Sequence, residues 1–261
     1  MSSITTDKGI LHYEVLGRGD PVIFLHGWLG SWALWKDVMT SIASRHRAYA
    51  LDFWGFGESG RKRDSYQMED FVDLIYQFMD QLGIESAPLI GHSMGGTVSL
   101  LTGLRHPDSV SKIIVVGSPI KGSSLALPLK LAGEKRIASF LYSNINIFRF
   151  FMKLYAPIIC KDARFPGLID QDIMNSTVDS FLKSIADLRH TDLTIEMQTI
   201  QMPILGLYGT KDNIVAATEW KTLKNSAPHA KIQLFPRSGH FVMLDQPQRC
   251  TESILEFLQK E

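Results

Sequence analysis

The feature that most constrains the fold of this chain is a regular alternation between short apolar runs and longer segments of helical periodicity. Continuous apolar runs such as Pro21–Leu25 are typical of strands that are covered on both faces. In other segments, such as Phe71–Leu82, apolar side chains recur every three or four residues. Strands that alternate with helices along a chain predict a mostly parallel sheet with helices on both faces.

The pattern predicts eight strands, of which the first two form an antiparallel pair around the turn Asp7–Gly9. The strands are expected at Ile4–Thr6, Ile10–Val15, Pro21–Leu25, Arg47–Leu51, Ala87–Ile90, Lys112–Val116, Pro203–Tyr208 and Lys231–Phe235. Helices of the sheet are expected at Trp35–Ile42, Phe71–Leu82, Ser93–Arg105, Thr218–Asn225 and Glu252–Gln259.

The alternation stops near Lys121 and resumes at Pro203. The stretch up to about Met197 contains no β-branched run of strand length, so it is expected to be wholly helical. We interpret it as an insertion between two strands that caps one edge of the sheet. The expected organisation is a core of residues 1–120 and 198–261 with a helical cap of residues 121–197.

The charge balance excludes several kinds of partner. Lys and Arg total 27 and Asp and Glu total 27, so no overall field favours nucleic acid, an anionic membrane or an acidic partner. A small, weakly charged ligand is expected instead. Cys160 and Cys250 lie far apart without metal-binding spacing, which predicts two buried free thiols.

The first residues lack the features of a secretory signal, and no apolar run reaches the roughly 18 residues of a membrane span. A cytoplasmic protein without an integral membrane segment is therefore expected. The sequence is compatible with a monomer or a homodimer.

A candidate nucleophile lies in Gly91–Gly95, with the sequence GHSMG. This pattern is the G-x-S-x-G elbow, in which a sharp turn between a strand and a helix lifts the serine hydroxyl clear of the backbone. The bare pattern is common, but here it falls between the strand that ends at Ile90 and the following helix. This position favours Ser93 as a nucleophile over Ser93 as an ordinary turn residue.

A serine nucleophile needs a base to take its proton and a carboxylate to orient that base. Asp212 follows one predicted strand and His240 follows the next, in the order Ser, Asp, His that such sheets use. Because active-site groups gather at the carboxyl ends of parallel strands, the three side chains are expected to converge. The alternatives are a turn aspartate at Asp212 and a surface turn histidine at His240.

The oxyanion of the reaction needs backbone N–H donors, and the expected donors are those of Met94 and Trp28. Met94 follows the nucleophile, and Trp28 lies in the loop after an early strand. The side chains of Trp28 and Phe241 are expected to contact substrate, although ordinary packing explains them equally well. His26 is expected to shape the oxyanion loop by bonding the backbone, and His92 is expected to point away from the serine.

These motifs together resemble the α/β-hydrolase superfamily. The resemblance rests on His26–Trp28, Asp52–Ser59, Gly91–Gly96, Asp212 and Ser238–His240, and it extends over residues 4–120 and 198–261. It is greatest for the compact capped branch that contains bacterial carboxylesterases, enol-lactonases and carbon-carbon bond hydrolases. Epoxide hydrolases and haloalkane dehalogenases share neighbouring motifs but use aspartate where this chain has Ser93.

The resemblance implies a serine hydrolase that cleaves a carboxylic ester through an acyl-enzyme, acting on a small-molecule acyl substrate and needing neither metal nor organic cofactor. Carbon-carbon bond hydrolysis, lactone opening and acyl transfer by the same residues remain alternatives. A non-catalytic ligand receptor that kept the fold is a third hypothesis.

The cap carries a dense apolar set within residues 140–159, among which lie Arg149 and Lys153. Most of this set is expected to pack the cap against the core. The remainder is expected to line an acyl pocket or, less favoured, to contact a membrane interface.

Overall fold

The computed structural model describes residues 2–61 and 64–259 and contains the predicted eight-stranded sheet. The strands follow the order β1-β2-β4-β3-β5-β6-β7-β8. They are β1 (Ser2–Thr6), β2 (Gly9–Leu16), β3 (Asp20–Leu25), β4 (His46–Leu51), β5 (Ala87–His92), β6 (Val110–Val116), β7 (Ile204–Gly209) and β8 (Lys231–Phe235). Strands β3 to β8 are parallel, and β2 pairs antiparallel with both β1 and β4.

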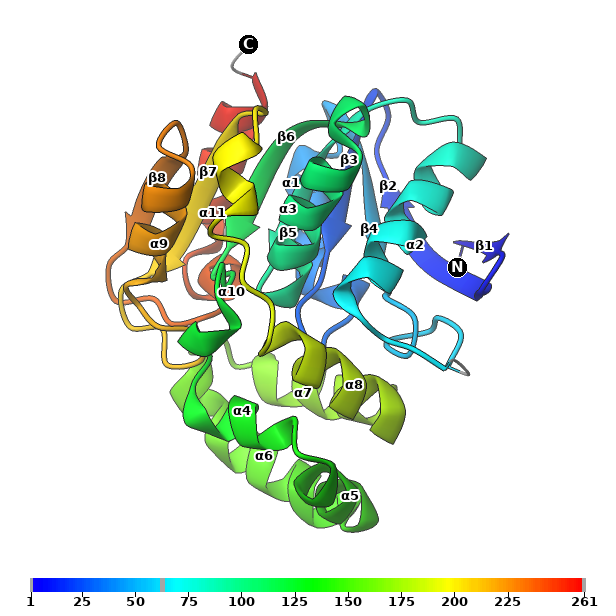
Figure 1. Cartoon of the computed structure of the whole chain (residues 1–261), viewed down its shortest axis with the longest axis vertical. Helices are drawn as coiled ribbons and strands as arrows, with labels where there is room; N and C mark the ends of the chain where they lie inside the picture. The colour runs from blue at the N-terminus through cyan, green and yellow to red at the C-terminus, as the bar shows by residue number, and fades with distance from the viewer. Residues whose placement is uncertain (1, 62–63, 260–261) are drawn as a thin grey trace.

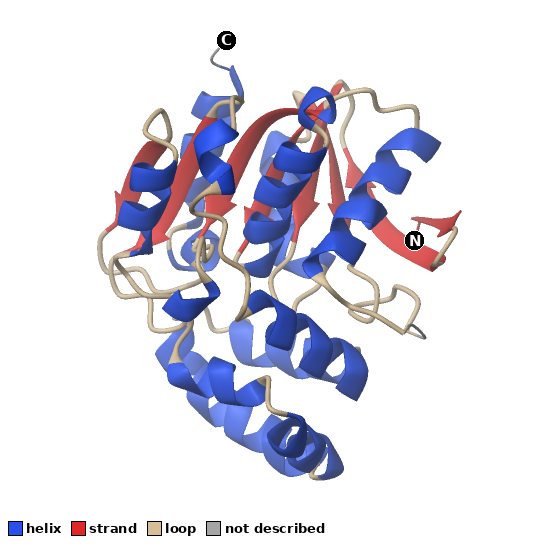
Figure 2. Cartoon of the chain, in the orientation of Figure 1, coloured by secondary structure: helices blue, strands red, loops and turns tan. Residues whose placement is uncertain are grey.

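Helices cover both faces of this sheet, as Figures 1 and 2 show. The helices α2 (Met68–Gln81), α3 (Met94–Arg105) and α9 (Glu219–Ser226) lie on one face, and α1 (Lys36–Ile42) and α11 (Pro247–Gln259) lie on the other. The central strands are buried on both sides, which explains why runs such as Val22–Leu25 are wholly apolar. The predicted arrangement, a mostly parallel eight-stranded sheet with helices on both faces, is confirmed.

Most element boundaries shift by one to three residues, and two larger differences lie near the end of the chain. Helix α11 begins at Pro247 rather than at Glu252, since proline is well suited to the first turn of a helix. The short helix α10 (Val242–Asp245) was not expected at all. Met1, Lys62, Arg63, Lys260 and Glu261, which the expected core boundaries include, lie outside the described residues.

Between β6 and β7 the chain forms five helices within the residues that the structure describes. They are α4 (Leu127–Ala132), α5 (Lys135–Ser143), α6 (Ile145–Ile159), α7 (Phe165–Met174) and α8 (Val178–Leu188). Figure 1 shows them together below the sheet, beyond the carboxyl ends of its strands. An isolated bridge between Lys121 and Asp192 joins the start of the insertion to its end. We propose this segment, residues 121–197, as the cap.

The apolar set of the cap does not pack as expected. The set consists of eleven side chains, namely Phe140, Leu141, Ile145, Ile147, Phe148, Phe150, Phe151, Leu154, Tyr155, Ile158 and Ile159. Seven of them are exposed: Phe140, Ile147, Phe150, Phe151, Leu154, Tyr155 and Ile158. The expectation that most of them join the cap to the core is wrong, because α6 carries apolar side chains on two faces and only one of these faces is turned inward. In residues 2–61 and 64–259, no helix has both the length and the apolar character needed to cross a membrane.

Candidate active site

Ser93 occupies a sharp turn between a strand and a helix. Strand β5 ends at His92, helix α3 begins at Met94, and Ser93 between them has a φ of 52° and a ψ of −118°. A positive φ is uncommon for a residue that carries a side chain and persists only where the surroundings enforce it. The turn is fixed by a hydrogen bond from the Ser93 N–H to the carbonyl of Val116 on the neighbouring strand, at 2.8 Å.

The glycine after this turn allows close packing against the end of β3. A Cβ atom on Gly95 would lie 2.5 Å from the carbonyl oxygens of both Leu25 and His26, so no other residue fits without moving the backbone. Similarly, a Cβ atom on Gly27 would lie 3.1 Å from the Cβ of Ser93. The loop after β3 therefore rests directly against the serine.

The predicted base and its carboxylate lie together at the ends of two neighbouring strands. Asp212 follows β7, His240 follows β8, and the His240 Nδ1 is 2.8 Å from the Asp212 Oδ2. The other carboxylate oxygen, Oδ1, accepts hydrogen bonds from the backbone N–H groups of Ile214 at 2.8 Å and Val215 at 2.9 Å. Both side chains are nearly inaccessible to water, so the carboxylate orientation is fixed from two sides.

Ser93 and His240 line one cavity of about 260 Å³ between the sheet and the helices α4–α8. Both are described residues, and no hydrogen bond joins the Ser93 hydroxyl to the His240 ring in this structure. Such a contact commonly tightens only when substrate is bound. The structure thus brings the three predicted residues to one place and forms one of the two hydrogen bonds that a relay needs.

The two expected oxyanion donors flank the serine. Met94 is the first residue of α3, where a backbone N–H has no acceptor within its own helix. Trp28 follows Gly27 in the loop that rests against Ser93. The Trp28 indole N–H donates to the Phe181 carbonyl of α8 at 3.0 Å, so this side chain also joins the core to the helices above it.

The loop that carries Trp28 is held in place by His26 and Asp52. The His26 Nδ1 lies 2.7 Å from the Gly27 carbonyl, and its Nε2 accepts from the Phe53 N–H at 2.9 Å. Full burial lowers the pKa of His26, which keeps the ring neutral and able to fill both roles. The Asp52 carboxylate accepts from the Trp32 N–H at 2.7 Å. His26 thus shapes the loop, as the sequence predicts, and Asp52 helps to hold it.

The wall of the cavity is almost entirely apolar. Trp28 and Phe241, the two expected substrate contacts, both lie in it. The apolar lining also includes Leu29, Ala126, Pro128, Leu129, Ala132, Leu141, Phe148, Met152, Tyr155, Ile159, Phe165, Ile169, Phe181 and Ile214. Asn213 and His92 add polar atoms, and the described lining contains no Asp, Glu, Lys or Arg. This cavity suits a neutral, apolar group.

Comparison with known proteins agrees with this geometry. The family model for the alpha/beta hydrolase fold matches residues 20–149, which include the loop after β3 and the elbow at Ser93. This chain has the α/β-hydrolase fold.

Several relatives of this α/β-hydrolase have known names. It is 25% identical to a pimeloyl-[acyl-carrier protein] methyl ester esterase of Vibrio cholerae, over 95% of this chain and 97% of that protein. It is 26% identical to a 2-hydroxymuconate semialdehyde hydrolase of Pseudomonas, over 93% of this chain and 88% of that protein. A thermophilic esterase from Thermogutta terrifontis has the same fold, with a TM-score of 0.84 and 24% identity over 99% of this chain and 97% of that one.

His92 of this α/β-hydrolase is a residue whose place the sequence did not predict. Instead of pointing away from the serine, it lies in the cavity wall, with its ring 4.6 Å from that of His240 and its Nε2 3.2 Å from the His240 carbonyl. Burial lowers the pKa of His92 well below its ordinary value, so the ring is neutral. One sequence feature could have predicted this place: His92 directly precedes Ser93 and is the last residue of its strand, so its side chain lies at the carboxyl edge of the sheet.

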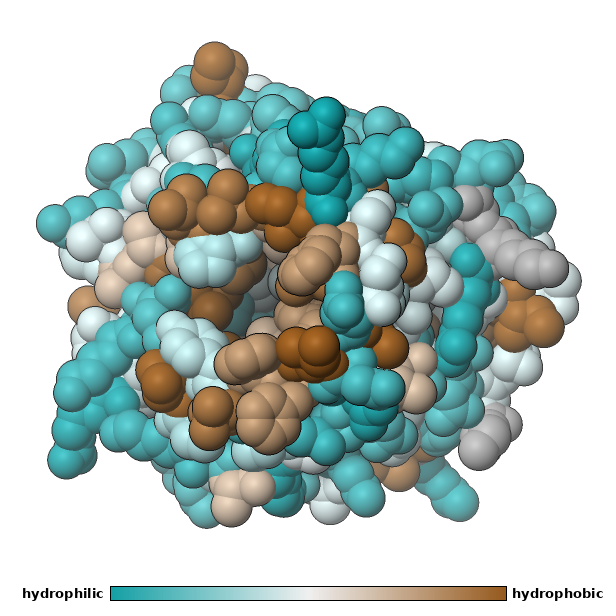
Figure 3. Space-filling model, turned by 90° about the horizontal axis from the view of Figure 1, so that it is seen from below, coloured by the Kyte–Doolittle hydropathy of each residue, from teal (hydrophilic) through white to brown (hydrophobic). Residues whose placement is uncertain are grey.

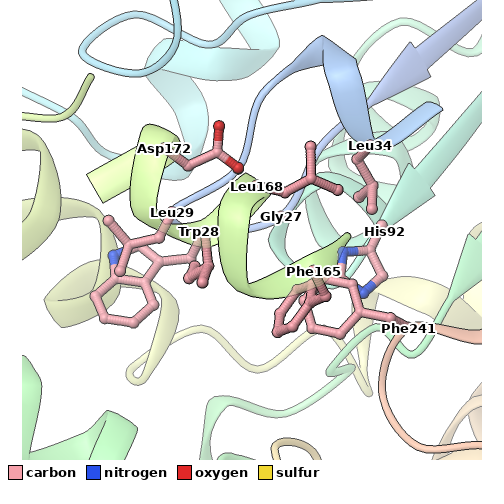
Figure 4. A pocket seen from close by; sticks show the side chains of 11 residues that line it. Gly27, Trp28, Leu29, Leu34, His92, Phe165, Leu168, Asp172 and Phe241 are labelled. Carbon is pink, nitrogen blue, oxygen red and sulfur yellow. The ribbon is translucent and has the colours of Figure 1, made fainter. Parts of the chain in front are cut away.

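Asp172 was also missed. It lies on α7, at the side of a smaller cavity of about 20 Å³ behind the Gly27–Gly30 loop, as Figure 4 shows. Burial raises the pKa of Asp172 to about 7, and the Ser31 hydroxyl partly opposes this shift. No sequence signal marks this carboxyl, because its burial depends on how α7 packs over the loop.

The two cysteines are buried free thiols, as expected. Burial raises the pKa of both Cys160 and Cys250 to about 12, which leaves them as unreactive thiols.

Proposed function

We propose that this α/β-hydrolase cleaves a carboxylic ester of a small, largely apolar substrate through an acyl-enzyme on Ser93. One observation carries the proposal. Ser93, held in the strained elbow, faces the same apolar cavity as His240, whose ring is hydrogen-bonded to Asp212. Nucleophile, base and orienting carboxylate are the three parts that serine acyl transfer requires.

In the proposed reaction, His240 removes the proton of the Ser93 hydroxyl as its oxygen attacks the ester carbonyl. The backbone N–H groups of Trp28 and Met94 stabilise the oxyanion that forms. When this intermediate collapses, the alcohol leaves with the proton from His240, and the acyl group stays on Ser93. Water, deprotonated by His240, then releases the acid and restores the serine.

The lining of the cavity supports an ester with a neutral acyl group. An anionic substrate would lose hydration on entry and would meet no Lys or Arg among the described lining residues. An apolar acyl chain would instead gain about 0.8 kcal/mol for each buried CH₂ group. The relatives named as a methyl ester esterase and as a 2-hydroxymuconate semialdehyde hydrolase act on different substrates. The uncharged wall favours the ester among these reactions.

The test is hydrolysis of p-nitrophenyl esters of increasing acyl length, compared with a lactone and a vinylogous diketone. Ser93→Ala should abolish ester hydrolysis and also abolish labelling by a fluorophosphonate probe. Ser99→Ala is the matched control, because Ser99 lies on the same helix, its hydroxyl donates to the Gly95 carbonyl at 2.8 Å, and it does not line the cavity. This control should keep full activity.

Trapping of the intermediate gives a second readout. Rapid quenching with a slow ester should leave the mass of one acyl group on the wild-type chain and none on the Ser93→Ala variant. Equal hydrolysis by both proteins would refute the role of Ser93. Turnover of the diketone or lactone with negligible ester hydrolysis would support the same active-site residues but refute ester hydrolysis as the reaction.

A further inference from the structure

Helix α6 carries apolar side chains on two faces. The outward face consists of Ile147, Phe150, Phe151, Leu154 and Ile158, which recur at helical spacing and are 57–66% exposed. The inward face includes Phe148, Met152 and Ile159, which line the cavity. Packing of the cap explains the inward face alone, so the outward face is left without a partner in the described chain.

The outward face is part of a larger apolar surface around the mouth of the cavity. We call this surface the cap face and define it as Leu127, Leu131, Phe140, Ile147, Phe150, Phe151, Leu154 and Ile158, all of which are exposed. Figure 3 views the molecule from this side and shows apolar residues gathered around a hollow. Pro128 and Tyr155 belong both to the exposed surface and to the cavity wall, so the cavity reaches the cap face.

The basic residues near the cap face are partly neutralised by ion pairs. Residues 121–164 contain eight Lys and Arg and two acidic residues, whereas residues 165–197 contain two Lys and Arg and six acidic residues. Arg149 and Lys153 pair with Asp170, Lys121 pairs with Asp192, and Arg164 pairs with Asp37 and Asp162. Lys135 and Arg136 remain exposed at the start of α5. An apolar helix face flanked by basic residues is the pattern of helices that lie in the interface of an anionic bilayer.

We propose that the cap face docks on an anionic lipid bilayer, with α6 lying in the plane of the interface. The exposed Lys135 and Arg136 favour this occupant over a second copy of the chain, because two copies would bring these like charges together. The row of large exposed apolar side chains decides between a bilayer and an acidic protein, because charge pairing alone would leave these side chains in water. Docking in this orientation turns the mouth of the cavity toward the lipid.

The test is co-sedimentation of the Ser93→Ala protein with vesicles, so that binding is measured without hydrolysis. Vesicles of phosphatidylcholine with phosphatidylglycerol should bind the protein, and vesicles of phosphatidylcholine alone should bind it much less. Binding should weaken as salt rises, because salt screens the attraction between the basic residues and the lipid headgroups.

Two pairs of variants separate the apolar and the charged contributions. Phe150→Gln with Leu154→Gln should weaken binding at least about tenfold, because two buried apolar side chains are lost from the interface. The matched control is Ile10→Gln with Ile195→Gln, at side chains that are 54% and 78% exposed elsewhere on the molecule. Lys135→Gln with Arg136→Gln should abolish the preference for the anionic vesicles.

Other outcomes would overturn the proposal. Equal binding by the Phe150/Leu154 variant and its control would show that the cap face is not the contact. Absence of binding to the anionic vesicles would show that the protein does not dock on an anionic bilayer. A dimer in sedimentation velocity that the Phe150/Leu154 change dissociates would identify a second copy as the occupant. Because Ser93→Ala is used throughout, none of these results bears on the proposed reaction.

Discussion

The substitution Asp212→Asn tests whether the carboxylate sets the proton on His240. In the native chain, Asp212 Oδ2 contacts the His240 Nδ1, while Oδ1 accepts from two backbone N–H groups. An asparagine side chain has one oxygen and one NH₂ group, so one of them must face the His240 ring and the other must face the two backbone N–H groups. Its oxygen will face the two backbone donors, because the reverse arrangement would leave both of them without an acceptor, at about 1–3 kcal/mol each.

The asparagine NH₂ group then faces the His240 Nδ1 and forces that nitrogen to act as an acceptor. The single ring proton must move to Nε2, so the ring can no longer remove the proton from Ser93. The expected loss in kcat is about 10⁴-fold, which corresponds to roughly 5.4 kcal/mol of transition-state stabilisation. The thermal midpoint should change little, since all three hydrogen-bond contacts survive.

The assay is single-turnover hydrolysis of the best p-nitrophenyl ester, together with thermal unfolding of each protein. Asp187→Asn is the matched control, because Asp187 accepts a backbone hydrogen bond from Met68 at 2.7 Å and does not line the cavity. It should keep wild-type kcat. A folded Asp212→Asn protein with less than a tenfold loss in kcat would refute the assignment of Asp212.

Three further predictions concern the surroundings of the site. Gly27→Ala should lower kcat/KM about 10²-fold, because its methyl group would lie 2.8 Å from the His92 Nδ1 and 3.1 Å from the Ser93 Cβ. Steady-state kinetics should show this loss in a variant whose circular dichroism spectrum is unchanged. Asp172→Asn should raise the free energy of unfolding at pH 8 by up to about 4 kcal/mol. The pKa of Asp172 is raised from 3.8 to about 7 in the fold, so the protonated carboxyl stabilises the fold below pH 4, and this contribution is lost as the pH rises through 7. The melting curves of the wild-type and Asp172→Asn proteins should therefore coincide at pH 4 and differ at pH 8. Phe148→Trp should shift the preferred acyl chain to a shorter one, measured as kcat/KM across the ester series, since Phe148 lines the cavity. An unchanged profile would place the acyl chain elsewhere.

Most of the sheet could be predicted from the sequence because its signals are local. Strands such as Pro21–Leu25 are apolar throughout because both faces are buried, and this composition is visible without any knowledge of neighbours. The elbow is equally local, since Ser93 is flanked by the glycines that its backbone requires. The positions of Asp212 and His240 follow from a general rule about the carboxyl ends of parallel strands.

The residues that were missed depend on packing between distant segments. Asp172 is ordinary in sequence, and its raised pKa arises only when α7 covers the loop after β3. The orientation of His92 depends on where the His240 loop crosses above it. Helix α6 illustrates the same limit, because its broad apolar surface predicts burial, whereas one apolar face lines a cavity and the other meets solvent.

The division between sheet and cap explains how such a site can change substrate and keep its chemistry. The proposed nucleophile, base and carboxylate all lie on turns fixed by the sheet, through contacts such as the 2.8 Å hydrogen bond from the Ser93 N–H to Val116. The cap and the core are joined by polar contacts such as the Trp28 indole with Phe181, Ser180 Oγ with the Gly55 carbonyl at 2.8 Å, and the Ala126 N–H with the Ile214 carbonyl at 2.8 Å. The inward side chains of α6, such as Phe148 and Met152, are apolar and make none of these contacts, so changes there alter the shape of the cavity without moving the sheet. The same independence allows the outward face of α6 to evolve toward a surface, such as a bilayer, while the proposed reaction continues beneath it.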